Sequence, residues 1–314
     1  MARFLARRFL GSVATLVGVV VAVFFLLAAA PGDPARMGAG SVSGRRASAE
    51  AVAEFRALHG LDRPLPARFG AWLASAARLD LGRSFRDGRP VTERIAETLP
   101  ATLAVNGLAL LFAALLGVPL GVTAARRPGG AADRLAGFLL DALFALPGFA
   151  LGLLLLLVFA VRLRWFPVFA DPSLGLRGIA LPVATLALVA VAPVAQVTRR
   201  AVREALCSPP ALAGRARGEG PVEETRRALR RAAPAFAGLA AALVPQLVAG
   251  SVLVERVFGL PGTGQLLADS VFSRDLPTVL GLTLCSGLAV VAAALASDAA
   301  AALADPRIAD GEEP

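Results

Sequence analysis

Few residues of this chain could act as nucleophiles, general bases or metal ligands. His59 is the only histidine, and Cys207 and Cys285 lie far apart, so neither a zinc site nor a disulfide framework is indicated. All 32 basic residues are arginine, and the chain has no lysine. A P-loop ATPase and a Schiff-base enzyme both require lysine. We therefore expect no catalytic residue, no bound cofactor and no metal site here.

The residues whose spacing could serve a partner lie in residues 198–231, which contain nine arginines. Ser208 followed by Pro209 is typical of an N-cap and the first position of a helix, and Gly218 is typical of its end. The sequence therefore predicts one short helix in the first half of this segment.

A second short helix is predicted to begin at Pro221. Acidic residues occupy its first turn and arginines its last turns, which is the charge order that a helix dipole favours. Glu223 can pair with Arg227 at the i, i+4 spacing. The segment either anchors the chain at a membrane surface or projects a small surface on which a soluble partner can act.

The rest of the composition is that of a membrane protein. Hydrophobic residues make up 56% of the chain and charged residues 18%, against about 25% charged in soluble domains. Mean hydropathy is +0.68. Crossing a bilayer takes about 20 apolar helical residues. We predict an all-α, polytopic bundle of six transmembrane helices, at residues 9–30, 101–125, 135–161, 179–197, 232–254 and 276–297.

Arginine counts predict the orientation. The first apolar run is longer than the roughly 7 to 15 residues of a signal-peptide core, so we expect it to be retained as a span. With residues 1–8 in the cytoplasm, short connecting segments hold 16 arginines inside and 5 outside. The remaining 11 lie in residues 31–97, and long loops cross the membrane largely regardless of charge. Both termini are therefore expected in the cytoplasm.

The long extracytoplasmic loop, residues 31–97, is expected to be partly helical. Ser48 looks like an N-cap, and Gly60 looks like the stop of that helix. Apolar residues at helical spacing follow Pro66, and others lead into the second span. These amphipathic helices either cap the bundle or form a docking surface. Residues 98–314 then form a five-helix core.

Residues of the inner segment resemble the cytoplasmic EAA motif of binding-protein-dependent ABC importers. The matching strings are Arg203-Glu204-Ala205-Leu206, then residues 214–218 (GRARG), and then residues 228–234 (ALRRAAP). Other strings resemble permease subunits of the dipeptide, oligopeptide and nickel class. They are PGDP at 31–34, GLDRPLP at 60–66, DLGRS at 80–84, GRPV at 88–91, LPATL at 99–103, GVPLGV at 117–122, VFGLPGTG at 257–264 and DPR at 305–307.

The resemblance implies a type I ABC importer permease fold in a bacterial inner (plasma) membrane. It also implies half of a translocation pathway, with a second permease subunit, two ATPase subunits that bind ATP, and an extracytoplasmic solute-binding protein that the long loop contacts. Coupling to the ATPases would involve Glu204, Ala205, Leu212, Arg215, Arg217 and Gly218. An outer gate or loop motif would involve Phe258, Gly259, Pro261, Gly262 and Gly264.

The inner segment departs from the family pattern at several positions. Pro209 and Pro210 stand where relatives have an acidic residue and a tyrosine, Arg217 replaces the usual lysine, and residues 218–234 are about two positions short. We hypothesise that Arg217 keeps the charge. Leu212 is expected to supply part of the apolar contact that the tyrosine would have made with the ATPase.

Two other functions are weighed against the permease. An ion-coupled carrier usually has ionisable residues at mid-membrane, and here only Asp141 lies within a span, near its cytoplasmic end. Asp298 lies just past the last span. A membrane scaffold without transport is the second alternative. ATP-dependent uptake that requires residues 203–218 would distinguish the permease from both. The transported solute is expected to be selected largely by the binding protein.

Overall fold

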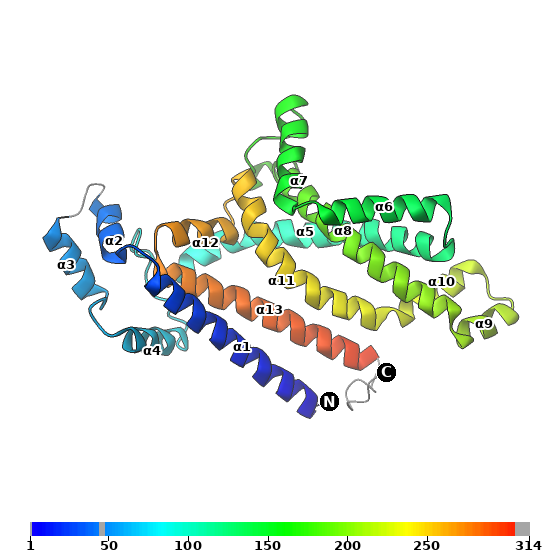
Figure 1. Ribbon diagram of the computed structural model, residues 1–314, viewed down its shortest axis with the longest axis horizontal. Coiled ribbons are helices and arrows are strands. Elements are labelled where there is room, and N and C mark those ends of the chain that lie inside the picture. The colour runs from blue at the N-terminus through cyan, green and yellow to red at the C-terminus, as the bar shows by residue number, and fades with distance from the viewer. Residues whose placement is uncertain (1, 44–47, 305–314) are drawn as a thin grey trace. The chain divides into compact units, whose positions relative to one another are not determined.

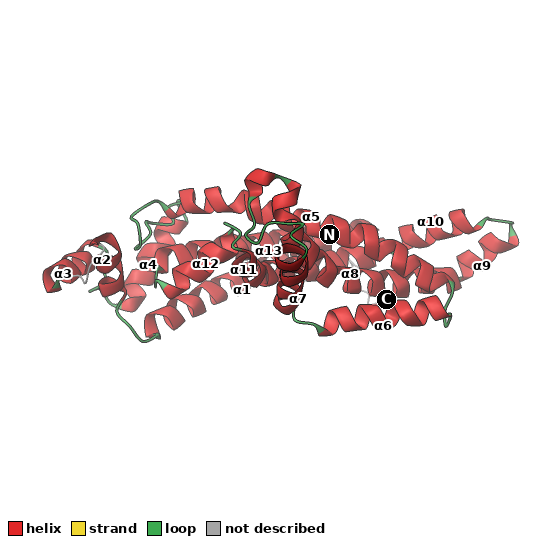
Figure 2. Cartoon of the chain, turned by 90° about the horizontal axis from the view of Figure 1, so that it is seen from above, coloured by secondary structure: helices red, strands yellow, loops and turns green. Residues whose placement is uncertain are grey.

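The computed structural model describes residues 2–43 and 48–304, and within them all regular structure is helical (Figure 2). This confirms the all-α prediction. The motif at Asp305–Arg307 lies outside the described residues, as does the side chain of Asp141. The helices are α1 Ala2–Ala29, α2 Pro34–Ser43, α3 Ala49–Leu58, α4 Leu65–Ala76, α5 Val91–Arg126, α6 Ala131–Ala145, α7 Gly148–Leu155, a π-helix Leu156–Arg162, a 3-10 turn Pro172–Leu174, α8 Leu176–Cys207, α9 Pro209–Ala216, α10 Pro221–Arg231, α11 Ala233–Phe258, α12 Thr263–Phe272 and α13 Leu276–Ala304.

Five of these helices are long and apolar enough to cross a membrane. They are α1, α5, α8, α11 and α13, with spans at Arg7–Ala29, Val91–Arg126, Leu176–Cys207, Ala233–Phe258 and Leu276–Ala300. The helices α5, α8 and α13 contain the predicted segments 101–125, 179–197 and 276–297 and extend beyond them. The helices α1 and α11 cover the predicted segments 9–30 and 232–254 except for one terminal residue each. Pro119, Pro182, Pro193 and Pro245 lie inside these helices, as expected.

The third predicted span, residues 135–161, is wrong as a single helix. The chain breaks between α6 and α7, and the apolar helix that remains is the shorter Gly148–Arg162. Leu146 adopts an extended conformation, with φ −80° and ψ 129°, directly before Pro147. The ring of a proline disfavours the helical conformation of the residue before it, and proline has no N–H for the helix ladder. An apolar run alone does not reveal such a break.

The described residues form two compact units. Unit 1 contains Leu103–Leu260 together with residues near both chain ends, and unit 2 contains Phe9–Thr102 and Pro261–Val291. In unit 1, α8 contacts α6, α7, α10 and α11 (Figure 1). The core of unit 1 includes Val105, Leu186, Leu247 and Phe258, all buried.

Glycines set how closely α5 approaches α8. A Cβ at Gly121 would lie 2.5 Å from the carbonyl oxygen of Ala195 and 2.5 Å from Cβ of Thr198. A Cβ at Gly117 would lie 2.7 Å from a methyl carbon of Val194. Small residues four apart allow membrane helices to pack at short distance. Gly117 and Gly121 of the GVPLGV string are thus part of the surface of α5 that packs on α8.

Unit 2 holds the helices predicted for the long loop. Ser48 caps α3 by accepting a hydrogen bond from the Ala51 N–H at 3.2 Å, which confirms that start, and α4 follows after Pro64. The lead-in to the second span is part of α5, which runs unbroken from Val91. Phe24 and Leu280 anchor one of its apolar clusters, at 1% exposure each.

Candidate functional site

The inner segment folds back onto the helix that precedes it. Val202, Ala205 and Leu206 near the end of α8 form a buried cluster with Ala125 of α5 and Ala228 of α10. Both short helices form where the sequence predicts them, α9 after Ser208 and α10 from Pro221 (Figure 1). Apolar burial therefore fixes α10 against the long helices α5 and α8.

Ser208 occupies the N-cap position of α9, but its hydroxyl does not cap the helix. It donates to the carbonyl oxygen of Ala205 at 2.7 Å and accepts from Nη1 of Arg231 at 2.8 Å. The reason is local: Pro210 has no N–H to offer, and the Ala211 N–H already bonds the Ser208 carbonyl at 2.9 Å. The hydroxyl instead ties the start of α9 to the end of α10.

Glu224 joins three elements. Its Oε1 accepts from Nε of Arg215 on α9 at 2.5 Å, and its Oε2 lies 3.7 Å from Nη2 of Arg126 at the end of α5. Arg215 also donates to the carbonyl oxygen of Leu206 at the end of α8, at 3.2 Å. Glu224 is 9% exposed. This carboxylate therefore links the two short helices to the end of α5.

The predicted pair of Glu223 with Arg227 is wrong. Arg227 pairs with Glu219, which also lies 3.2 Å from Arg217, whereas Glu223 lies 3.9 Å from Arg226. The turn between the helices places Glu219 close to Gly214, where a Cβ would lie 2.5 Å from Nη1 of Arg227. Sequence spacing within α10 could not reveal a partner that belongs to the turn.

The predicted coupling residues divide into two groups. Ala205 is buried in the apolar cluster, and Arg215 is held by Glu224. Glu204, Leu212, Arg217 and Gly218 are exposed, Leu212 at 55%. Among the residues that the structure describes, no three His, Cys, Asp or Glu side chains are placed to hold a metal ion. The segment thus presents exposed side chains on two short helices that buried residues and ion pairs hold in place.

The second predicted group, residues 258–264, connects α11 to α12. Phe258 is 1% exposed in the core of unit 1, and its carbonyl oxygen accepts from the Ala170 N–H at 2.7 Å. Gly259 ends α11 in the left-handed region, with φ 61°, and the Leu260 N–H bonds the carbonyl oxygen of Glu255 at 2.9 Å. Glycine adopts that conformation without strain.

The remaining residues of this group belong to unit 2. Gly262 is the N-cap of α12, and Gly264 is buried in its first turn. The Thr263 N–H donates to Oγ1 of Thr102 at 2.8 Å. Pro261 lies between the two helices. Gly259 and Gly262 of the VFGLPGTG string thus mark the end of α11 and the start of α12. The role of the string as an outer gate stays a prediction.

Comparison with known proteins identifies the family. Residues 117–310 match the model for "binding-protein-dependent transport system inner membrane component", and residues 1–106 match the model for the N-terminal part of such components. The chain belongs to this family. As a permease subunit of an ABC transporter it is a multi-pass inner-membrane protein. Members of this family work with ATPase subunits and binding proteins.

Relatives match this permease from end to end. The chain is 34% identical over 319 residues to the glutathione transport system permease protein GsiC of Pectobacterium atrosepticum. It is 32% identical over 321 residues to the oligopeptide transport system permease protein AppB of Bacillus subtilis. Each alignment covers 98% of this chain and 99% of the relative. The family resemblance stated from the motifs is confirmed.

A solved structure is similar in fold. The inward-facing MetNI methionine ABC transporter includes a chain that matches this permease with a TM-score of 0.55 and 19% identity. The match covers 68% of this chain and 97% of the other. It confirms the type I ABC importer permease fold.

The permease also contains a buried polar network that its sequence did not lead us to predict. Asp275, fully buried before α13, accepts from the Phe85 N–H at 2.9 Å and from Oγ of Ser84 at 2.5 Å. Nη1 of Arg94 lies 3.0 Å away and Oγ1 of Thr278 2.7 Å away. An Asp directly before an apolar helix is an N-cap signal, which could have located it.

A second missed pair lies in unit 1. Asp133, 5% exposed, accepts from Nη2 of Arg199 at 2.8 Å and from the Gly129 N–H at 3.0 Å. The pair joins the first turn of α6 to α8. Arg199 belongs to the part of α8 that the arginine counts predict to lie in the cytoplasm. Residues 66 positions apart give no local signal of such a contact.

Proposed function

We propose that this permease forms half of the translocation pathway of an ATP-driven importer for peptides or similar small solutes. The named relatives transport oligopeptides or glutathione, which is itself a small peptide. A second permease subunit would supply the other half, two ATPases would bind ATP, and a solute-binding protein would deliver the peptide. The permease itself would hold no ATPase site and no cofactor.

The orientation proposed is the one with both termini in the cytoplasm. Short connecting segments then carry 16 arginines inside and 5 outside, which follows the positive-inside rule. In this orientation residues 198–231 face the ATPases, and the helices α2, α3 and α4 face the binding protein. Residues 258–264 would lie near the outer end of the pathway.

The observation that carries the proposal is the way α9 is held. Leu212 is exposed, whereas Ala211 and Gly214 form the buried side of α9. Arg215 ties the helix to Glu224, which in turn lies close to Arg126 of α5. A push on α9 would therefore reach the ends of α5 and α8 through ion pairs and a buried apolar cluster. Closure of the ATPases could in this way rock the helices between inward-open and outward-open states.

Leu212→Ala tests the contact surface. Truncating a side chain at the centre of an interface costs about 1 kcal/mol or more, or about fivefold in affinity. We expect at least that loss in co-purification of the ATPases and a matching loss of ATP-dependent uptake of a radiolabelled tripeptide by the reconstituted complex. Leu174→Ala is the matched control, because Leu174 is equally exposed, at 55%, and lies on the predicted outer side.

Two results would contradict the proposal. Unchanged association and uptake in Leu212→Ala would remove Leu212 from the coupling surface. Uptake driven by a proton gradient through this chain alone, or ATP-dependent uptake that survives deletion of residues 203–218, would contradict the proposed importer mechanism.

A further inference from the structure

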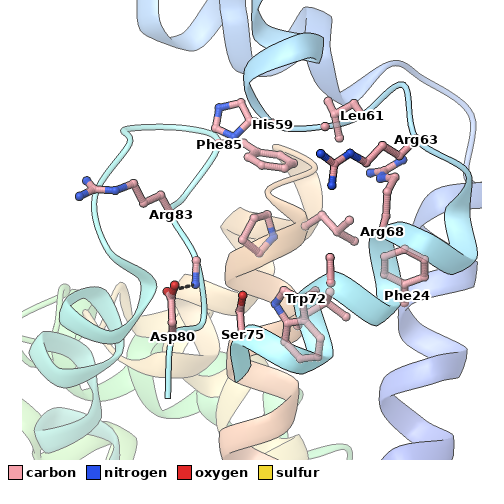
Figure 3. A pocket seen from close by; sticks show the side chains of 16 residues that line it. Phe24, His59, Leu61, Arg63, Arg68, Trp72, Ser75, Asp80, Arg83 and Phe85 are labelled. Carbon is pink, nitrogen blue, oxygen red and sulfur yellow. Dashed lines mark hydrogen bonds between the residues drawn. The ribbon is translucent and has the colours of Figure 1, made fainter. Parts of the chain in front are cut away.

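Unit 2 contains a cavity of about 260 Å³ whose lining combines cations with apolar rings. Figure 3 shows Arg63, from the link between α3 and α4, and Arg68, from α4, with their guanidinium groups toward the same end of this cavity. Phe24 near the end of α1 and Trp72 of α4 lie beneath them. The first turns of α13 complete the wall with Leu276 and Leu280. The cavity therefore has an apolar floor and a cationic rim.

The two arginines carry charge that the described residues do not balance. Neither guanidinium forms an ion pair within residues 2–43 and 48–304. The acidic lining residue, Asp80, is exposed and accepts from the Gly82 N–H at 2.9 Å. Burial lowers the pKa of Arg68, and no neighbouring carboxylate counters that effect. His59 also lines the cavity, and burial lowers its pKa, so it adds no charge at neutral pH.

A buried donor without an acceptor lies in the same wall. Nε1 of Trp72 is inaccessible to solvent and meets no hydrogen-bond acceptor among the described residues. Buried indole N–H groups are normally paired. Two unpaired guanidinium groups and one unpaired N–H are all donors, so the group that would satisfy them must present several acceptor oxygens and negative charge.

The apolar surroundings indicate where such a group would come from. On α1, next to the buried Phe24, Phe25 is 40% exposed and Leu26 is 70% exposed. The ring of Phe25 lies 6.4 Å from that of Phe69, the neighbour of Arg68 on α4. The helix α4, which carries Arg68 and Trp72, thus packs beside the end of the α1 span. Arginine and tryptophan at that level are typical of the interface with lipid head groups. An acyl chain could follow α1 while its head group reaches the cavity.

We propose that this cavity is a phosphate-binding site, with Arg63 and Arg68 as its cationic contacts and the Trp72 N–H as a further donor. The phosphate would be that of a phospholipid head group or a free phosphate ion. The site is independent of the coupling surface on α9, so its test does not depend on transport.

Native mass spectrometry of the purified full-length permease tests the site, in one arm with phosphatidylglycerol and in the other with inorganic phosphate. We expect the Arg63→Gln/Arg68→Gln variant to bind its most tightly held phosphatidylglycerol molecule at least about tenfold more weakly, since two charge-assisted donors are lost. Trp72→Phe should weaken it less and leave the fold intact. A loss seen with phosphate as well would mean that the free ion also enters the site.

Arg83→Gln is the matched control. Arg83 lines the same cavity, but its Nη1 donates to the carbonyl oxygen of Gly88 at 3.0 Å, and Figure 3 shows its side chain extending away from Arg63 and Arg68. It should bind as the wild type does. Equal binding of both probes by the double variant and the wild type would overturn the proposal, and so would an equal loss in Arg83→Gln.

Discussion

At the scale of single residues, unit 2 depends on side chains that would be costly to bury alone. The carboxylate of Asp275 is fully buried and is matched by the Arg94 guanidinium and by hydroxyl and N–H donors. Removing one partner of a buried ion pair leaves the other uncompensated. His59, in contrast, is partly buried, and burial lowers its pKa and so keeps it neutral. Its ring centroid lies 4.2 Å from that of Phe55 and 4.8 Å from that of Phe85.

Asp275→Asn is predicted to destabilise unit 2 by about 3 kcal/mol, because it removes the closest carboxylate of the buried Arg94 and leaves only the more exposed Asp87 at 3.5 Å. Thermal unfolding in detergent together with limited proteolysis of residues 31–97 measures the effect. Asp62→Asn, which removes an exposed carboxylate from the same loop, should leave both unchanged. Equal stability of Asp275→Asn and wild type would contradict a supporting role for the network.

Because of His59, we expect the free energy of unfolding to fall when the pH is lowered. Burial lowers its pKa in the folded state below the ordinary value of about 6.5, and this outweighs the opposite effect of Asp275. The unfolded chain therefore takes up the proton first, so the contribution is fully present above about pH 6.5 and is lost as the pH falls from there through the lower folded-state pKa. Unfolding temperatures between pH 7.5 and 5 should fall more steeply for wild type than for His59→Gln. Parallel curves would exclude the effect.

At the scale of elements, the approach of α5 to α8 in unit 1 depends on glycines rather than on large apolar side chains. Gly117 and Gly121 are one turn apart and each faces atoms of α8 closer than a Cβ allows. Membrane helices gain little from burying apolar surface away from lipid, so close packing must supply the attraction. The short helix α10 packs against the C-terminal ends of these same two helices.

Gly121→Ala is predicted to lower stability by about 1 to 3 kcal/mol, the usual cost of overpacking, because the new Cβ would meet the Ala195 carbonyl oxygen at 2.5 Å. Gly107→Ala is the matched control on the same helix, since no atom lies within 4 Å of a Cβ there. Thermal unfolding of the two variants and the wild type measures the difference in stability. A similar change in both would show that helix propensity, not the contact with α8, governs the effect.

At the scale of the whole molecule, the proposed topology assigns every segment to one side of the membrane. Residues 198–231 and both termini would lie inside, and residues 31–97 outside. The two natural cysteines make this testable, because Cys207 at the end of α8 is exposed, whereas Cys285 lies within the span of α13.

In a Cys285→Ala background, a membrane-impermeant maleimide should label Cys207 in inverted membrane vesicles and leave it unlabelled in intact spheroplasts. Moving the cysteine to the long loop, as Cys207→Ala with Arg78→Cys, should reverse the pattern, since Arg78 is exposed. Labelling of Cys207 in spheroplasts would place the coupling segment outside and would contradict the proposed contact with the ATPases.

The sequence by itself determined the helical class, the long apolar segments, the two short helices after Ser208 and Pro221, and the family. Each of these depends on local information: apolar run length, a proline at a helix start, or a string of matching residues. Ala49–Leu58 was likewise predictable, because its Ser48 cap acts within three residues.

Only the tertiary structure decided which side chains meet. The partners of Glu224 are on α9 and α5, Asp275 meets Ser84 and Arg94, and Arg63 and Arg68 come to one cavity with Trp72. The break before Pro147 belongs here too, because prolines inside α8 and α11 leave those helices continuous. Composition records that a charge or a proline is present, whereas its effect depends on neighbours that the chain brings together only by folding.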